Sequence, residues 1–294
     1  MNGNKPEADD RRRSVTHMTS GIPTSDGAGV NMTRIIGTPE LDHLDPFLLF
    51  DVFESDNPDD YLAGFPPHPH RGFETVTYML AGQMRHRDNA GNEGVIRAGG
   101  VQWMTAGRGI IHSEMPEQEN GLMWGTQLWV NLPQREKMTA PAYQEFAAAD
   151  IPAERRDGNM EIRTIAGNSG AVADRPTEPI YLDIKLSANA TVSETLAATH
   201  NAFLFVIEGS VWIGDQEIPA RTLAILADGE TVSVETRNEK SRFLLVAGRK
   251  LDEPVARAGP FVMNTQSELK QAIDDYQSGR FQQSVRPTLP PTAP

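Results

Sequence analysis

Residues 74–104 read ETVTYMLAGQMRHRDNAGNEGVIRAGGVQWM, and this stretch decides the fold class. Three short runs rich in apolar and β-branched residues alternate with turn residues; the runs are Glu74–Leu80, Gly94–Ile96 and Val101–Met104. Glycines mark each of the intervening turns. Several short strands at this spacing are typical of an all-β sandwich or barrel. We therefore predict an all-β fold.

The pattern extends in both directions from this stretch. Strands are expected at Phe47–Phe53 and Gln127–Leu132, and a second set at Tyr181–Leu186, Ala202–Ile207, Ser210–Ile213, Thr222–Leu226, Thr231–Glu235 and Arg242–Ala247. Tyr78–Gly82 parallels Phe205–Gly209, since each is a β run that ends in a glycine-containing turn. This weak internal repeat favours two barrels.

The domain boundaries follow from where polar and proline-rich stretches fall along the chain. We expect a partly disordered N-terminal arm over 1–30, a first barrel over 31–150, a second barrel with a terminal helix over 151–286, and a disordered tail over 287–294. The arm and the tail are polar, and three prolines fall in the linker region 133–160.

One helix is predicted near the C-terminus. Thr265 and Glu268 have the spacing of a capping box. The apolar residues Leu269, Ala272, Ile273 and Tyr276 then form one helical stripe. Gly279 is well placed to end the helix. We expect the stripe to pack on a barrel.

Composition excludes several functional classes. The formal net charge is -13, which disfavours direct nucleic-acid binding because phosphate contacts need clustered Lys and Arg. The chain has no cysteine, so disulfides, thiolate ligands and cysteine nucleophiles are absent. No stretch approaches the roughly 20 apolar residues that span a bilayer. We expect a cytoplasmic protein without a membrane partner.

The first candidate for chemistry is the segment FPPHPHRGF at 65–73, which contains His68 and His70. In an extended chain, residues two apart point to the same face, so both imidazoles can reach one ion. Pro69 biases His68 toward an extended backbone, which partly arranges the two ligands in advance.

His112 and Glu114 repeat this spacing in GIIHSE at 109–114. Two such pairs on neighbouring strands would surround an ion with three imidazoles and one carboxylate. That set suits Fe, Ni, Mn, Cu, Co or Zn, of which we expect Fe, and it leaves coordination positions open for a substrate. We expect His68, His70, His112 and Glu114 to bind one divalent metal ion.

Glu74 is the competing carboxylate, because H-x-H-x3-E is also a metal-ligand spacing and Glu74 shares the strand parity of His70. Its alternative role is to orient a ligand histidine. The remaining histidines, His17, His43, His86 and His200, are expected to be surface or core residues, although His86 lies near enough in the chain to line the mouth of the site.

The sequence resembles the pirin family, a bicupin group of the cupin superfamily. The resemblance runs through most of the chain and is carried by the segments LDPF at 44–47, FPPHPHRGFET at 65–75, VQWMTAGRGIIHSE at 101–114, QLWVNLP at 127–133 and GPFVM at 259–263. The second and third segments are highly specific, whereas the second barrel matches in pattern more than in residues.

The resemblance implies two cupin-type (jelly-roll) β-barrels, with metal in the N-terminal one only. It places the ligands at His68, His70, His112 and Glu114 and ranks Glu74 below Glu114. Some pirins resemble quercetin 2,3-dioxygenases, so we expect an oxidoreductase that cleaves a flavonol or a similar enol with dioxygen. Glu114 would be the catalytic base.

Gln127, Trp103 and Met104 are the candidate pocket residues beside that base, although barrel packing is the favoured role for Trp103 and Met104. The alternative function is a non-enzymatic, metal-dependent regulator that binds a transcription factor or a metabolic enzyme, as other pirins do. A third class, a cupin isomerase or epimerase, is disfavoured by the ligand set.

Overall fold

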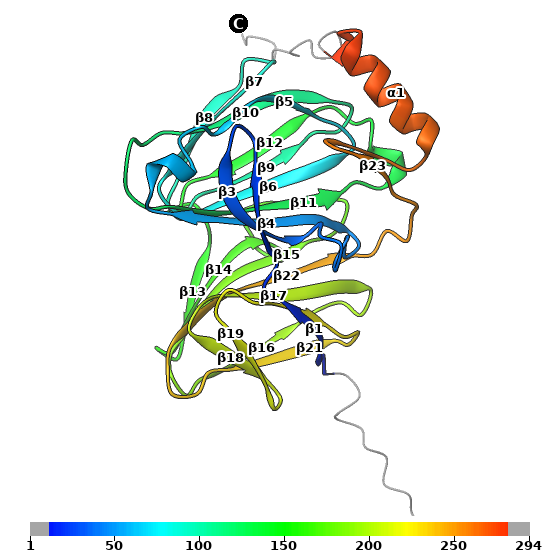
Figure 1. Cartoon of the computed structure of the whole chain (residues 1–294). Helices are drawn as coiled ribbons and strands as arrows, with labels where there is room; N and C mark the ends of the chain where they lie inside the picture. The colour runs from blue at the N-terminus through cyan, green and yellow to red at the C-terminus, as the bar shows by residue number, and fades with distance from the viewer. Residues whose placement is uncertain (1–11, 282–294) are drawn as a thin grey trace, which may run out of the picture. The chain divides into compact units, whose positions relative to one another are not determined.

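The computed structural model describes residues 12–281, which divide into two compact units. We call the unit made of Pro23–Arg34, Phe47–Ala148 and the stretch from Asp252 onward the first barrel unit. The second barrel unit contains the residues up to Ile22, Ile35–Pro46 and Ala149–Leu251. Both consist mainly of β-strands (Figure 1), so the predicted all-β fold with two barrels is confirmed.

The first barrel unit is built from two large sheets and a small hairpin. Its seven-stranded sheet has the order β12-β9-β6-β11-β4-β3-β2 and its four-stranded sheet the order β5-β10-β7-β8. The bounds in chain order are β2 (Ile22–Asp26), β3 (Val30–Ile36), β4 (Phe47–Ser55), β5 (Phe65–His70), β6 (Phe73–Ala81), β7 (Gln83–Asp88), β8 (Glu93–Arg97), β9 (Val101–Thr105), β10 (Ile110–Pro116), β11 (Met123–Asn131) and β12 (Ala142–Phe146).

The second barrel unit has the same two-sheet plan. Its seven-stranded sheet has the order β1-β20-β17-β22-β15-β14-β13, and its four-stranded sheet the order β16-β21-β18-β19. The bounds are β1 (Val15–Thr19), β13 (Ala153–Arg156), β14 (Met160–Ala166), β15 (Ile180–Leu186), β16 (Thr191–Thr195), β17 (His200–Glu208), β18 (Ser210–Ile213), β19 (Gln216–Pro219), β20 (Leu223–Leu226), β21 (Thr231–Glu235) and β22 (Ser241–Arg249). An apolar core that includes Phe243, Leu204 and Ile184 fills this barrel.

The C-terminal segment folds onto the first barrel unit. It forms the hairpin β23 (Ala256–Ala258) and β24 (Phe261–Met263), followed by α1 (Gln266–Gln277), which contacts the hairpin (Figure 1). The capping box of Thr265 and Glu268 is present as predicted. Leu269 and Ala272 of the predicted stripe are buried, whereas Tyr276 is 40% exposed.

Two parts of the predicted domain layout differ from the structure. The stretch 1–30 was expected to be a partly disordered arm, but its described part contains β1 and β2. Their weak apolar pattern gave no signal, because each lies at the edge of a sheet, where β1 is only half-buried and β2 is largely exposed. The terminal helix was expected with the second barrel, but it belongs to the first barrel unit. The predicted tail at 287–294 lies outside the described residues.

The prolines of β5 fit its place in the sheet. β5 is an edge strand, where a residue without a backbone N–H is tolerated. Its pairing with β10 shifts between His112, which is opposite His68, and Glu114, which is opposite Phe65. Pro66 and Pro67 therefore occupy a β-bulge, a place where a ladder hydrogen bond is lost anyway.

No helix among residues 12–281 is long and apolar enough to cross a membrane.

Candidate metal centre

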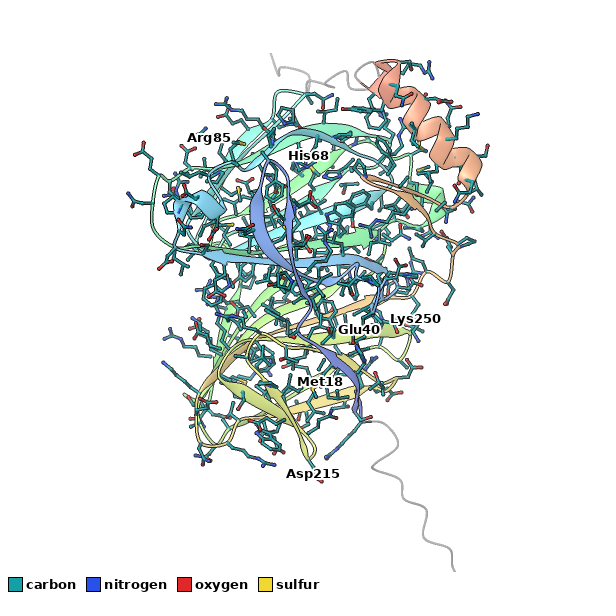
Figure 2. The ribbon with its side chains drawn as sticks, viewed as in Figure 1. Met18, Glu40, His68, Arg85, Asp215 and Lys250 are labelled. Carbon is teal, nitrogen blue, oxygen red and sulfur yellow. The ribbon has the colours of Figure 1, made fainter. Side chains whose placement is uncertain are left out.

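Three histidines converge inside the first barrel unit. His68 and His70 project from the same face of β5, and His112 lies directly opposite His68 on β10. The ring centroids are 4.7 Å apart for His68–His70, 4.5 Å for His68–His112 and 5.0 Å for His70–His112. One ligand nitrogen from each ring lies within 4.8 Å of the others, so the three could hold one metal ion. Figure 2 labels His68 within this unit.

The histidines differ in exposure and in charge state. His70 and His112 are buried, whereas His68 is half-buried and its Nδ1 lies 2.8 Å from the Pro66 carbonyl. Burial holds the pKa of both His70 and His112 well below the ordinary histidine value, and the neighbouring imidazoles lower it further. Both rings are thus held neutral, which is the form that binds metal.

Glu114 lies beside the histidines and is held by a polar network. Its Oε2 is 4.0 Å from Nε2 of His112. Thr77 Oγ1 lies 3.0 Å from Glu114 Oε1 and 2.6 Å from Gln127 Oε1, and Gln127 Nε2 donates to Glu114 Oε2 over 3.1 Å. The carboxylate is 3% exposed, so these hydrogen bonds fix the position of a buried group.

Glu74 is buried in a different environment. It is fully inaccessible, and its Oε1 accepts a 2.6 Å hydrogen bond from Thr105 Oγ1 of β9. Neither glutamate belongs to the group of ligand atoms within 4.8 Å of one another, but Glu114 lines the cavity beside the histidines and Glu74 does not. Geometry therefore favours Glu114 over Glu74.

Of the three expected pocket residues, the structure places one in the cavity. A cavity of about 510 Å³ opens beside His68, His70 and Glu114, and Gln127 lines it. Trp103 and Met104 do not line it, in agreement with the packing role that is the alternative for both. They are buried on β9, where Met104 packs with Ala106 and Ile110. Their apolar character reflects packing rather than contact with a ligand.

Polar residues on the opposite wall of this cavity were not predicted from the sequence. Arg34 makes two hydrogen bonds to Asp51, of 2.9 and 2.7 Å, and a third to Asp26. All three residues line the cavity, as does Arg257 from the C-terminal segment. A signal was present, because Asp51 is the single charged residue in the otherwise apolar run 47–53. A charge inside a buried strand needs a partner.

His86 does not line the cavity. It is buried on β7, with Nε2 2.6 Å from Glu145 Oε2, and it stacks on Tyr143. His17 and His43 are partly exposed and lie near acidic side chains, and His200 is buried against the Glu178 carbonyl. These placements agree with surface or core roles.

Comparison with known proteins resolves the family. Residues 29–130 match the family model described as Pirin, and residues 181–282 match that of the Pirin C-terminal cupin domain. A pirin-like protein of Caulobacter vibrioides is 52% identical over 92% of this chain and 99% of its own length. The chain belongs to the pirin family.

Solved structures agree with this membership. A quercetin 2,3-dioxygenase from Acinetobacter baumannii matches the pirin fold of this chain with a TM-score of 0.84 and 33% identity, over 92% of this chain and 98% of its own. The bacterial pirin YhhW from Escherichia coli, solved in complex with nickel(II), has a TM-score of 0.61 and is 21% identical, over 78% of this chain and 96% of its own. The second likeness shows the fold alone.

The residues of this pirin fit a transition-metal ion. His70 Nδ1 and both ring nitrogens of His112 are buried without a hydrogen-bond partner among residues 12–281. Buried polar atoms are normally satisfied, so unpartnered ring nitrogens in a cluster of three histidines indicate a ligand. Neutral imidazoles and a nearby carboxylate form a donor set that such ions bind.

Proposed function

We propose that this chain is a metal-dependent dioxygenase of the quercetin 2,3-dioxygenase type, which cleaves a flavonol or a similar enol with dioxygen. His68, His70, His112 and Glu114 would hold one divalent ion, and Fe is our first choice. The observation that carries the proposal is the cavity of about 510 Å³ that opens on Glu114 and two of the histidines. This volume lies in the roughly 300–1,000 Å³ range of small-molecule sites.

The bound ion would supply Lewis acidity, which lowers the pKa of an enol hydroxyl. Glu114 is the residue of this chain placed to accept that proton at a carboxylate oxygen. Thr77 and Gln127 hold the carboxylate in place, so it is oriented before the substrate arrives. Apolar side chains such as Leu49, Phe53 and Trp129 line the same cavity and would exclude water from the reacting atoms.

A regulator that only binds another protein needs no such interior space. The cavity, more than the histidines themselves, therefore favours an enzyme over the regulatory alternative. Both functions would use the same metal, so metal content alone does not separate them.

The test is consumption of quercetin and dioxygen by the metal-loaded protein. Loading with Fe, Mn, Ni, Cu and Co in turn should give at least one form that removes the flavonol absorbance and takes up oxygen. The His70→Ala variant should lose this activity, and the His43→Ala variant should keep it, because His43 is an exposed residue whose ring pairs with Asp42. Absence of turnover with every metal contradicts the proposal.

A further inference from the structure

A row of polar side chains crosses the cavity wall away from the histidines. Gln127 of β11 lies directly opposite Thr77 of β6 on one side and Asp51 of β4 on the other. Residues directly opposite each other in a sheet share a face, and all three line the cavity. Arg34 of β3 continues the row through its two hydrogen bonds to Asp51.

Apolar side chains flank this row on both sides. Leu49 and Trp129 lie opposite each other two residues before Asp51 and two residues after Gln127, and Phe53 lies two residues beyond Asp51. Side chains two apart on a strand point to the same face, and all three line the cavity. A polar row between apolar rows suits a flat molecule with apolar faces and polar edges.

The two ends of the row differ in chemistry. The end near the histidines is Glu114, which accepts hydrogen bonds from Thr77 and Gln127. The far end is the pair of Asp51 and Arg34, in which Asp51 is 5% exposed. Each of its oxygens accepts one hydrogen bond from Arg34. A carboxylate offers about four lone-pair sites, so Asp51 retains capacity to accept further hydrogen bonds.

The charges at the far end favour a neutral donor over an anion. Arg34 already donates to Asp51 and Asp26, and Arg257 donates to the Leu48 carbonyl with its guanidinium 5.0 Å from the Trp129 ring centroid. The two arginines and two aspartates carry no net formal charge. A substrate group that reaches this end therefore meets a fixed carboxylate acceptor rather than a free cation.

We propose that Asp51, fixed by Arg34, accepts a hydrogen bond from a hydroxyl group of the substrate at the edge remote from its enol. The site then selects flat aromatic enols that carry a second, distal hydroxyl. This inference rests on the proposed function, in which the enol oxygen faces Glu114. It makes Asp51 a specificity-determining residue that stands outside the metal centre.

The test compares quercetin, which is hydroxylated on its outer rings, with 3-hydroxyflavone, whose only hydroxyl is the enol. Dissociation constants are measured without oxygen on the metal-loaded protein by quenching of tryptophan fluorescence, and kcat/KM is measured with oxygen. A hydrogen bond to a charged group contributes about 10–100-fold. The wild type should prefer quercetin by about this factor, and Asp51→Asn should reduce the preference to about threefold or less.

Asp183→Asn is the matched control. Asp183 is also buried and accepts two hydrogen bonds from one arginine, Arg242, at 3.0 and 2.6 Å, but it lies in the second barrel unit. This variant should keep the preference for quercetin. If Asp51→Asn does not fold, the double variant Arg34→Gln/Asp51→Asn removes both charges together, which buried pairs tolerate better than the loss of one partner.

The outcomes separate this inference from the proposed function. An unchanged preference in folded Asp51 variants overturns the inference, as does a wild type that binds both flavonols equally. If the wild type binds quercetin preferentially but turns over neither flavonol, and the Asp51→Asn variant lacks this binding preference, the inference stands and the proposed function fails. If both flavonols are consumed and the preference survives the substitution, the function stands and the inference fails.

Discussion

His68 and His112 lie directly opposite each other on the paired strands β5 and β10, with their ring centroids 4.5 Å apart. The strand pairing itself sets this approach, so neither imidazole depends on a loop for its position. Donors placed on rigid elements lose little conformational freedom when an ion binds.

Loss of His112 should remove the metal. Substitution of an outer partner of a metal ligand costs about 10–100-fold in affinity, so removal of a direct donor by His112→Ala should weaken binding by more than about tenfold. Metal content after desalting, measured by mass spectrometry, checks this result. His43→Ala is the control and should retain wild-type metal. Full retention by His112→Ala would exclude this residue as a ligand.

The two carboxylates should behave differently. Glu114→Gln is expected to lower metal affinity, because Glu114 lies 4.0 Å from His112 and lines the cavity. Glu74→Gln should lower it less, since Glu74 bonds to Thr105 outside the cavity. Competition with a chelator of known affinity measures both variants. A larger loss for Glu74→Gln would reverse the ranking of the two residues.

Thr77→Val should reduce turnover while leaving the fold intact. The substitution is nearly isosteric and removes the hydroxyl that lies between Glu114 and Gln127. Loss of such an orienting group costs about 10–100-fold in activity. Thr105→Val is a matched control, because its hydroxyl also bonds to a buried glutamate but outside the cavity. Equal effects of the two substitutions on kcat would contradict the role of Thr77.

Stability of the metal-free protein should fall as the pH falls. Burial keeps the pKa of His70 and His112 well below the ordinary value, so the folded state leaves both rings neutral. The unfolded chain takes up these protons below about pH 6.5, and it then binds more protons than the folded state. The stability contribution is thus complete above about pH 6.5 and is lost as the pH falls toward the folded pKa values.

Each histidine can contribute a slope of up to about 1.4 kcal/mol per pH unit in this range. Urea unfolding in the presence of a chelator, at about pH 7.5 and about pH 5.5, measures the slope. The double variant His70→Gln/His112→Gln should show a shallower dependence than the wild type. The same slope in both proteins would show that other groups set the acid sensitivity.

Gly72→Ala should destabilise the loop that follows the histidines of β5. Gly72 has φ 89°, and an added Cβ would lie 1.9 Å from the Val262 carbonyl oxygen. Gly91 has φ 91° and no atom within 4 Å of such a Cβ. Gly91→Ala should therefore lower the free energy of unfolding by about 1–2 kcal/mol from backbone conformation alone. Gly72→Ala should lower it by clearly more. Denaturant midpoints of the two variants compare these costs.

Much of the fold could be predicted because buried strands leave continuous apolar runs. Phe47–Phe53 and Tyr181–Leu186 fall within the observed β4 and β15. The histidine group could be predicted for a similar reason, since spacing of two residues in an extended chain brings side chains to one face. Both inferences need only local geometry.

The far wall of the cavity could not be predicted in this way. Arg34 and Asp51 come from different strands, and their pairing depends on a register that no local pattern reveals. The same holds for β1, whose Val15 pairs with Leu226. Arg257 was missed because its segment follows the second barrel in the chain, and no local pattern indicates that this segment returns to the first.

The composition of the first barrel unit has a consequence for synthesis. By Asn131 the ribosome has produced the three histidines of the candidate metal centre, together with Glu114 and Gln127. Arg257 and Pro260 of the cavity wall follow only after Ala149–Leu251. Chains emerge from the N-terminus onward, and contacts between distant segments form slowly. The nascent protein can therefore present its candidate metal ligands well before the cavity around them is closed, so an ion that binds there can enter through a wall that is still incomplete.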